Sequence, residues 1–179
     1  MIDLVARAQH GDREAFATLV AAVADRLHGA AFLMVRDRSR AEDAVQEGLI
    51  RCWRELPTLR DPTRFEAWTR RIVVRAAIDE ARRARATPHI TLLVDVAGEY
   101  AEADLLVARD TLERAFGRLT PEHRAALVLR HYLSLTVPEI AEALGIPDGT
   151  AKSRLHHATQ AMRAAIEADE RVTKRSYSA

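Results

Sequence analysis

The chain is poor in several residue types, and each shortage excludes a class of protein. Cys52 is the only cysteine among 179 residues, so no internal disulfide can form and a reducing, cytoplasmic setting is expected. Its helical spacing from Leu49 and Leu56 favours a small buried residue over a reactive thiol. No apolar run approaches the roughly 20 residues of a membrane span, and no basic leader precedes one, so no membrane insertion is expected.

Aromatic and strand-forming residues are also scarce. Aromatic residues make up 5% of the chain, whereas alanine, arginine and leucine are abundant and runs of β-branched residues are almost absent. This composition predicts an all-α protein. Apolar residues make up 48% of the chain, which at this length is enough for one ordinary domain or two small ones.

The net charge of +1 says little about partners, because opposite charges are segregated along the chain. One segment is basic and the next is acidic. The basic residues are Arg70, Arg71, Arg75, Arg82, Arg83 and Arg85, and the acidic ones are Asp95, Glu99, Glu102 and Asp104.

Residues 136–155 predict two short helices joined by a tight turn. Thr136 and Glu139 are spaced as a capping box at the start of the first helix. Gly145 suits the left-handed residue that ends a helix, and Thr150 is expected to cap the helix that follows. Such a pair of helices is typical of a helix-turn-helix.

The second helix of this pair has one apolar and one polar side. Its apolar residues are Ala151, Leu155, Ala158 and Met162, and its polar ones are Lys152, Ser153, Arg154, His156 and His157. A basic, hydroxylated outer face predicts a recognition helix that enters a DNA major groove. A helical hairpin packed inside a bundle is the alternative, which the small turn residues make less favourable.

Helical periodicity predicts a first body over residues 1–86. A short opening helix is followed by a long one capped by Asp12, whose apolar residues recur every three or four positions. Ser39 and Glu42 predict a capping box for the next helix. Asp61, followed by a proline, predicts the start of the last helix in this body.

A linker and a second body follow. Residues 87–104 lose the helical rhythm, and fully extended they would reach roughly 60 Å, enough for two bodies to sit apart on one duplex. The second body is expected over residues 105–170, with Thr120 capping one of its helices. Residues 171–179 are polar and are predicted to form a disordered tail.

Three separated blocks carry a resemblance to a known family. They are residues 40–54 (RAEDAVQEGLIRCWR), residues 65–72 (FEAWTRRI) with Arg82 and Arg83, and residues 119–155, which include LTPEHR and EIAEALGIPDGTAKSRL. In this order and spacing they resemble the extracytoplasmic-function group of bacterial RNA polymerase sigma factors, from about residue 2 to residue 168. The resemblance implies two helical domains joined by a flexible linker. The first would bind and melt the minus-ten promoter element, and the second would read the minus-thirty-five element.

The resemblance implies contacts with core RNA polymerase, on its β′ clamp and its β flap. The implied clamp-binding residues share one face of the first block and are Asp43, Gln46, Glu47 and Ile50. An exposed isoleucine among acidic and amide groups is an apolar anchor with a polar rim, which suits a protein interface. From the residues alone, a solvated helix face would be the simpler interpretation.

The resemblance places minus-ten DNA contacts in the second block and the loop before it. The implied residues are Arg60, Arg70, Arg71, Arg75, Arg82 and Arg83. Residues 56–61 stand where the family holds a flipped base, which costs a few kcal/mol to extrude. Trp68 can stack on a base, although its spacing to the neighbouring apolar residues favours a core position. The family often has Arg-Asn where this chain has Val74 and Arg75, so the resemblance does not fix the minus-ten preference.

The minus-thirty-five contacts are implied at Thr150, Lys152, Ser153, Arg154, His156 and His157. Lys152 is expected to meet a phosphate, and Ser153 and Arg154 to meet base edges or adjacent phosphates. The family commonly has basic or hydroxyl residues where this chain has the two histidines. Because neutral histidine is mostly uncharged, binding is expected to depend more on Lys152 and Arg154.

Two other interpretations remain at this stage. A helix-turn-helix regulator that recruits no polymerase would leave the first block unexplained, and a sigma-like interaction module would give no promoter-specific transcript. An enzyme is the least favoured class, since the sequence has no glycine-rich phosphate loop and no nucleophile–base pair at a plausible spacing. No cofactor or metal is expected, because the histidine pairs, His123 with His131 and His156 with His157, lie in different helices without a cysteine among them. The expected partners are core RNA polymerase and promoter DNA, with an anti-sigma protein as a candidate third.

Overall fold

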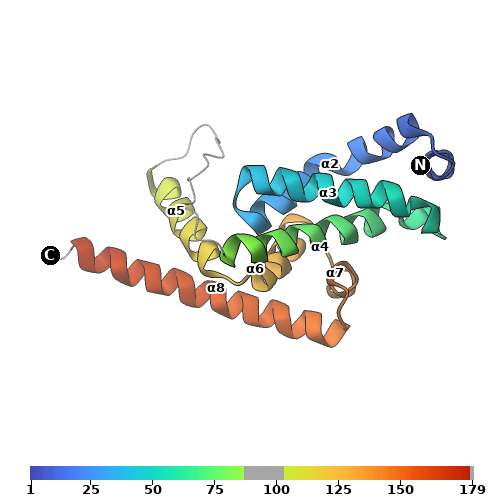
Figure 1. Ribbon diagram of the computed structural model, residues 1–179. Helices are drawn as coiled ribbons and strands as arrows, with labels where there is room; N and C mark the ends of the chain where they lie inside the picture. The colour runs from blue at the N-terminus through green and yellow to red at the C-terminus, as the bar shows by residue number, and fades with distance from the viewer. Residues whose placement is uncertain (87–102, 178–179) are drawn as a thin grey trace.

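The computed structural model describes residues 1–86 and 103–177, without the side chains of residues 86, 103–109, 170 and 172–177. The described residues contain helices and no strand, which confirms the all-α prediction (Figure 1). The predicted linker, residues 87–104, lies almost entirely outside the described residues. The first body contains α1 (Ile2–Gln9), α2 (Arg13–Val35), α3 (Arg38–Glu55), η1 (Leu56–Thr58), η2 (Pro62–Arg64) and α4 (Phe65–Ala86). The second contains α5 (Ala103–Arg118), α6 (Pro121–Leu127), the π-helical turn η3 (Val128–Tyr132), α7 (Val137–Leu144) and α8 (Asp148–Tyr177).

Aspartate caps set the starts of the helices in the first body. The side chain of Asp12 accepts a hydrogen bond from Ala15 N at 3.0 Å, and Asp61 caps η2, as predicted. The cap of α3 differs from the prediction. Asp37, not Ser39, accepts a hydrogen bond from Arg40 N at 3.0 Å, because an aspartate two residues earlier already satisfies the first free N–H groups.

The second body confirms the predicted turn and corrects its last helix. Thr120 accepts from His123 N at 3.2 Å, the capping box at Thr136 is present, and Gly145 has a φ of 65°. However, α8 begins at Asp148, so Thr150 lies inside its first turn and does not cap it. The helix continues to Tyr177 and covers most of the segment that was expected to be a disordered tail.

One apolar core runs through both bodies. Met34, Val45 and Val74 of the first body belong to the same buried cluster as Leu129 and Ile140 of the second. In Figure 1, α4 lies between α3 on one side and α6 and α7 on the other. The two predicted bodies therefore pack directly against each other in this arrangement.

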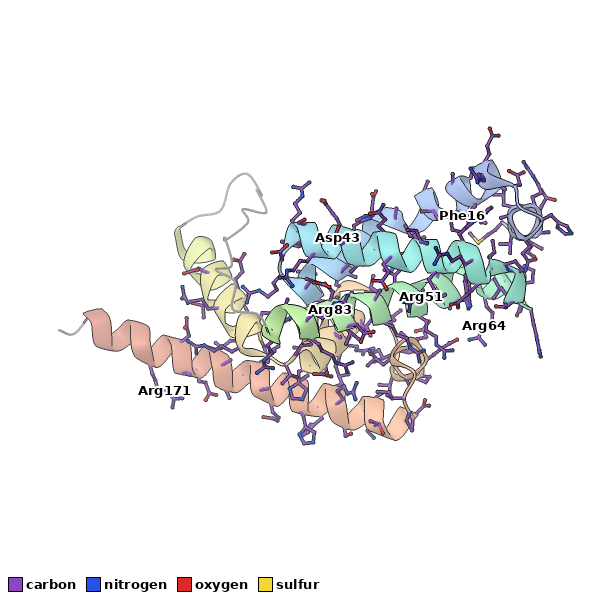
Figure 2. The ribbon with its side chains drawn as sticks, in the orientation of Figure 1. Phe16, Asp43, Arg51, Arg64, Arg83 and Arg171 are labelled. Carbon is purple, nitrogen blue, oxygen red and sulfur yellow. The ribbon has the colours of Figure 1, made fainter. Side chains whose placement is uncertain are left out.

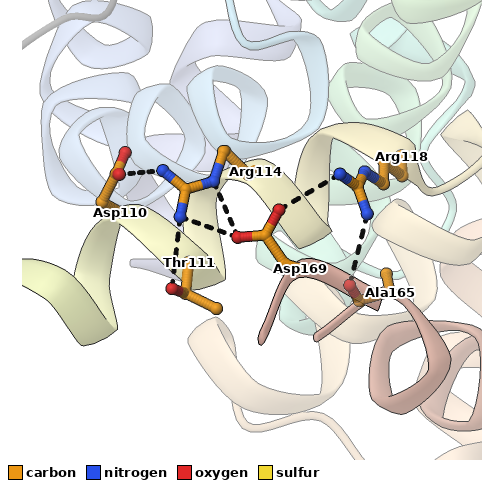
Figure 3. Close-up of polar contacts among 6 residues, drawn as sticks. All are labelled: Asp110, Thr111, Arg114, Arg118, Ala165 and Asp169. Carbon is orange, nitrogen blue, oxygen red and sulfur yellow. Dashed lines mark hydrogen bonds and ion pairs between the residues drawn. The ribbon is translucent and has the colours of Figure 1, made fainter. Parts of the chain in front are cut away.

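The end of the first body and the long last helix have smaller clusters of their own. Val5, Leu19, Leu56 and Phe65 form a buried group under α1, and Leu119, Ala126, Leu127 and Ala158 join α6 to α8. Asp169 of α8 accepts hydrogen bonds from Arg114 at 2.8 Å and from Arg118 at 3.1 Å, which ties α5 to α8 (Figure 3).

By length and hydropathy alone, α2 could cross a membrane, which differs from the expectation that no apolar stretch approaches that length. The core helix of a globular protein passes the same test, and Leu19, Leu27 and Met34 of α2 are buried in the two clusters described above. We therefore describe α2 as a core helix.

Candidate nucleic-acid and protein interfaces

The outer face of α3 carries the predicted polymerase-binding residues. Asp43, Gln46, Glu47 and Ile50 are all exposed, and 45% of Ile50 is accessible to solvent. Figure 2 labels Asp43 on α3. Glu47 accepts a hydrogen bond from Arg51 at 2.9 Å, so part of its charge is compensated locally. The structure thus places the four predicted residues on one surface, with the apolar side chain uncovered.

An apolar hollow adjoins this surface, between α2 and α3. It has a volume of about 330 Å³, and its lining includes Ile50, Phe16 and Trp53. The rings of Phe16 and Trp53 pack with their centroids 5.0 Å apart. Sequence reasoning missed this hollow, because helical periodicity predicts a buried apolar stripe along α2, whereas Phe16 is only half-buried.

One face of α4 points toward the second body. Arg75 and Arg82 are seven residues apart, so they share this side of the helix axis. Arg64, just before α4, pairs with Glu142 of α7. The guanidinium of Arg75 lies against Gly145, leaving no room for a Cβ atom there. Two arginines predicted to bind the minus-ten strand, Arg75 and Arg82, therefore contact the other body.

Arg82 makes the best-defined of these contacts. Its Nε donates to Glu122 of α6 at 2.7 Å, and its Nη1 donates to Asp79 at 3.1 Å. Burial alone would raise the pKa of Glu122, but the hydrogen bond from Arg82 and the nearby charge of Arg154 contribute to a pKa below its ordinary value. Sequence reasoning gave no role to Glu122, which lies 40 residues from its partner.

The remaining predicted minus-ten residues differ in their exposure. Arg60 and Arg71 are exposed, and Arg83 pairs with Glu80 at 2.7 Å. Arg70 is half-buried, and its Nε has no hydrogen-bond partner in the described part of the chain. Trp68 is half-buried against the cluster under α1, which agrees with the core interpretation of its spacing.

The second helix of the helix-turn-helix presents most of its predicted DNA residues to solvent. Thr150, Lys152, Ser153, His156 and His157 are exposed. Ser153 Oγ donates to the carbonyl of Thr150 at 3.1 Å, which holds the hydroxyl close to the helix surface.

Arg154 differs from these neighbours. It is half-buried, and it lies close enough to Glu122 to lower the pKa of that carboxylate. In this arrangement Arg154 stands at the edge of the exposed face of α8, not at its centre.

No group of three or more histidine, cysteine, aspartate or glutamate side chains suited to a metal ion occurs within the described ranges. The histidines at positions 156 and 157 face each other edge to face, with ring centroids 5.6 Å apart.

Comparison with known sequences matches one family to each of the two bodies. The family Sigma-70 region 2 matches residues 19–87, and the family Sigma-70, region 4 matches residues 109–162. The ECF RNA polymerase sigma factor SigM of Mycobacterium tuberculosis is 34% identical over 154 residues, which cover 85% of this chain and 77% of SigM.

Two solved structures share the fold. CnrH, solved in complex with the cytosolic domain of CnrY, has a TM-score of 0.68 and 29% identity, covering 94% of this chain and 97% of CnrH. RpoE of Bartonella quintana, solved in complex with the anti-sigma factor NepR, has a TM-score of 0.68 and 22% identity, covering 86% of this chain and 98% of RpoE. The second likeness shows the fold alone.

Proposed function

The chain belongs to the extracytoplasmic-function group of bacterial RNA polymerase sigma factors, and we propose how its two bodies divide the work of this group. Sigma factors of this group bind core RNA polymerase, recognise minus-ten and minus-thirty-five promoter elements and direct transcription initiation. Residues 1–86 bind the polymerase and melt the minus-ten element. Residues 105–170 read the minus-thirty-five element. The observation that carries this division is the exposure of an apolar anchor, Ile50, on one body and of a polar recognition helix on the other.

The outer face of α3 is the polymerase-binding surface in this proposal. Ile50 inserts into the β′ clamp, and the neighbouring hollow beside Trp53 receives an apolar side chain of the partner. Asp43 and Glu47 form the charged rim of this surface. The rim orients the polymerase and speeds its association with the chain more than it adds affinity.

Separation of the two bodies favours the minus-ten contacts. Arg82 is paired with Glu122, and Arg75 lies against Gly145, so a DNA phosphate must compete with these contacts for either exposed guanidinium while the bodies are packed together. Arg60 and Arg71 are already exposed and are proposed to meet the strand first. Binding to polymerase is proposed to favour the separated arrangement by holding each body at its own site.

The exposed face of α8 makes the minus-thirty-five contacts. Lys152 meets a phosphate, and Ser153 lies on the same exposed side, where it can reach a base edge. Arg154 completes the set, and Glu122, which belongs to the same body, stays near it whether or not the bodies separate. The second body is also the part proposed to reach the β flap.

We further propose that an anti-sigma protein controls this chain. CnrH and RpoE, which share its fold, were solved in complexes, and the partner of RpoE is named an anti-sigma factor. The uncovered Ile50 and the adjacent apolar hollow form a surface that such a partner can cover. The polymerase carries out the chemistry of RNA synthesis, so the chain itself needs no catalytic centre. The proposed location of the protein is the cytoplasm.

A reconstituted transcription reaction tests the proposal. Core RNA polymerase, the purified chain and genomic fragments should give transcripts with defined starts, and the chain should be retained on immobilised core enzyme. Retention without transcripts would indicate an interaction module. DNA binding without retention would indicate a regulator that recruits no polymerase.

A further inference from the structure

A second hollow lies where the two bodies meet. It has a volume of about 380 Å³ and is lined by the end of α2, the start of α3, the ends of α4 and α5, and α6. We call it the arginine hollow, since its lining includes five arginines and one acid, which are Arg36, Arg40, Arg85, Arg118, Arg124 and Asp37. Nothing in the assigned promoter or polymerase surfaces uses it.

Two of the five arginines already have carboxylate partners. Arg40 pairs with Glu80 at 3.0 Å, and Arg118 pairs with Asp169 at 3.1 Å. The one acid among the described lining residues, Asp37, is occupied as the cap of α3. Arg36, Arg85 and Arg124 form no ion pair with any described residue, although the carboxylate of Glu113 on α5 lies close enough to Arg36 to favour its charged form.

Arg124 is the deepest of these side chains. Only 8% of it is exposed, and its Nη atoms donate to the carbonyls of Met34 at 2.7 Å and Leu119 at 3.2 Å. Its Nε is buried and has no partner among the described residues. Burial, followed by the charges of Arg36 and Arg85, lowers the pKa of Arg124 to about 10. The site therefore holds three mutually repelling cations and an unused buried donor.

We propose that the arginine hollow binds a small phosphorylated anion, such as pyrophosphate or the phosphates of a free nucleotide. Guanidinium groups match phosphate oxygens with paired hydrogen bonds, and a phosphoryl group offers acceptors for several arginines at once. A volume of about 380 Å³ lies within the range of small-molecule sites. A duplex backbone cannot reach Arg124 because that side chain is almost fully covered.

The position of the hollow couples this ligand to the arrangement of the bodies. Arg36 and Arg85 come from the first body, and Arg124 comes from the second. An anion that contacts all three binds the packed arrangement more tightly than a separated one, and so stabilises it by mass action. In that arrangement Arg82 stays paired with Glu122. The ligand would thus oppose promoter binding.

The test is a titration of the full chain with inorganic pyrophosphate at constant ionic strength. Calorimetry measures the binding, and the thermal unfolding midpoint measures the stabilisation. We expect saturable binding at one site and a midpoint that rises with pyrophosphate. Arg36→Gln and Arg85→Gln should each weaken binding at least about tenfold, the discrimination that a paired arginine contact typically gives. Arg85→Lys, which keeps the charge, should restore part of the affinity.

Arg163→Gln is the matched control, because Arg163 is an exposed arginine on α8 that is absent from the hollow lining. It should bind pyrophosphate like the parent chain. Absence of saturable binding in the parent chain, or an equal loss in Arg163→Gln, overturns the proposal. A titration with duplex DNA separates the two sources of phosphate. If Arg36→Gln and Arg85→Gln weaken duplex binding as much as pyrophosphate binding, the hollow belongs to the DNA surface and the proposal fails.

Discussion

The guanidinium of Arg82 on α4 donates to the carboxylate of Glu122 on α6 at 2.7 Å, so a side chain predicted to hold promoter phosphates is paired across the two bodies. The side chain of Arg82 is 55% exposed, and a pair of this kind contributes only about 0–1 kcal/mol. The shared apolar cluster around Leu129 and Ile140 must therefore supply most of the attraction between the bodies. In the proposed function, Glu122 therefore competes with DNA phosphate for Arg82 and holds the two bodies together only weakly.

Replacing Glu122 with Gln should destabilise the packed arrangement slightly, by up to about 1 kcal/mol at pH 7. The folded-state pKa of Glu122 lies below its ordinary value of 4.5, so its contribution is present above about pH 4.5 and is lost as the pH falls through the lowered value. Urea unfolding of the parent chain and of Glu122→Gln across this pH range checks the sign. A difference that grows on acidification would contradict the ion pair.

Reversing charge at Asp43 and Glu47 together, to Lys, should abolish retention on core polymerase, because the rim of the α3 surface would then repel its partner. The helical circular dichroism should be unchanged, since both residues are exposed. The matched control is Asp25→Lys with Glu167→Lys, which makes the same charge change at two other exposed positions. A melted fold in the first variant would show that Asp43 and Glu47 are structural.

Arg154 and Lys152 should respond differently to substitution by Ala. If Arg154 reads a base, its loss should weaken binding to the preferred minus-thirty-five sequence by about 1–3 kcal/mol and leave unrelated duplexes almost unaffected. Loss of Lys152 should weaken all duplexes alike and reduce the log–log salt slope by about 0.9. Fluorescence anisotropy over a range of salt concentrations measures both. Uniform loss in Arg154→Ala would mean that it contacts phosphate only.

Substituting Arg124 with Met should destabilise the fold by about 1.5–3 kcal/mol, because hydrogen bonds from charged groups contribute that much and buried carbonyls would lose their donor. The carbonyl of Met34 lies near the end of α2, where few other donors are available. Chemical denaturation compares this variant with Arg163→Met, whose side chain is exposed and which should be nearly neutral. Equal stability of the two variants would contradict the buried role of Arg124.

The sequence predicted the features that depend on nearby residues. The caps at Asp12 and Thr120, the capping box at Thr136 and the left-handed Gly145 are all local, since each is decided within four residues. The two missed starts have local causes as well. Asp37 preceded the predicted cap of α3, and α8 begins at Asp148, within the turn.

The packing of the bodies against each other could not be predicted in this way. Arg64 and Glu142 are 78 residues apart, and Arg124 and Met34 are 90 residues apart. Spacing along one helix shows which side chains share a face, but not which distant element covers that face. The sequence therefore identified the arginines of α4 but not their acidic partners. It did not predict the arginine hollow either, because the hollow forms only where four helix ends meet in the fold.

The lone thiol has a practical consequence. Cys52 is fully buried in α3, and burial raises its pKa to about 12, so almost none of it is thiolate near neutral pH. Maleimide reagents react with the thiolate, which attacks their double bond, so they should leave Cys52 unmodified. A pair of fluorophores can then be attached to cysteines engineered on α3 and α8 without replacing Cys52. The distance between them would report how far the bodies move when polymerase or an anion is added.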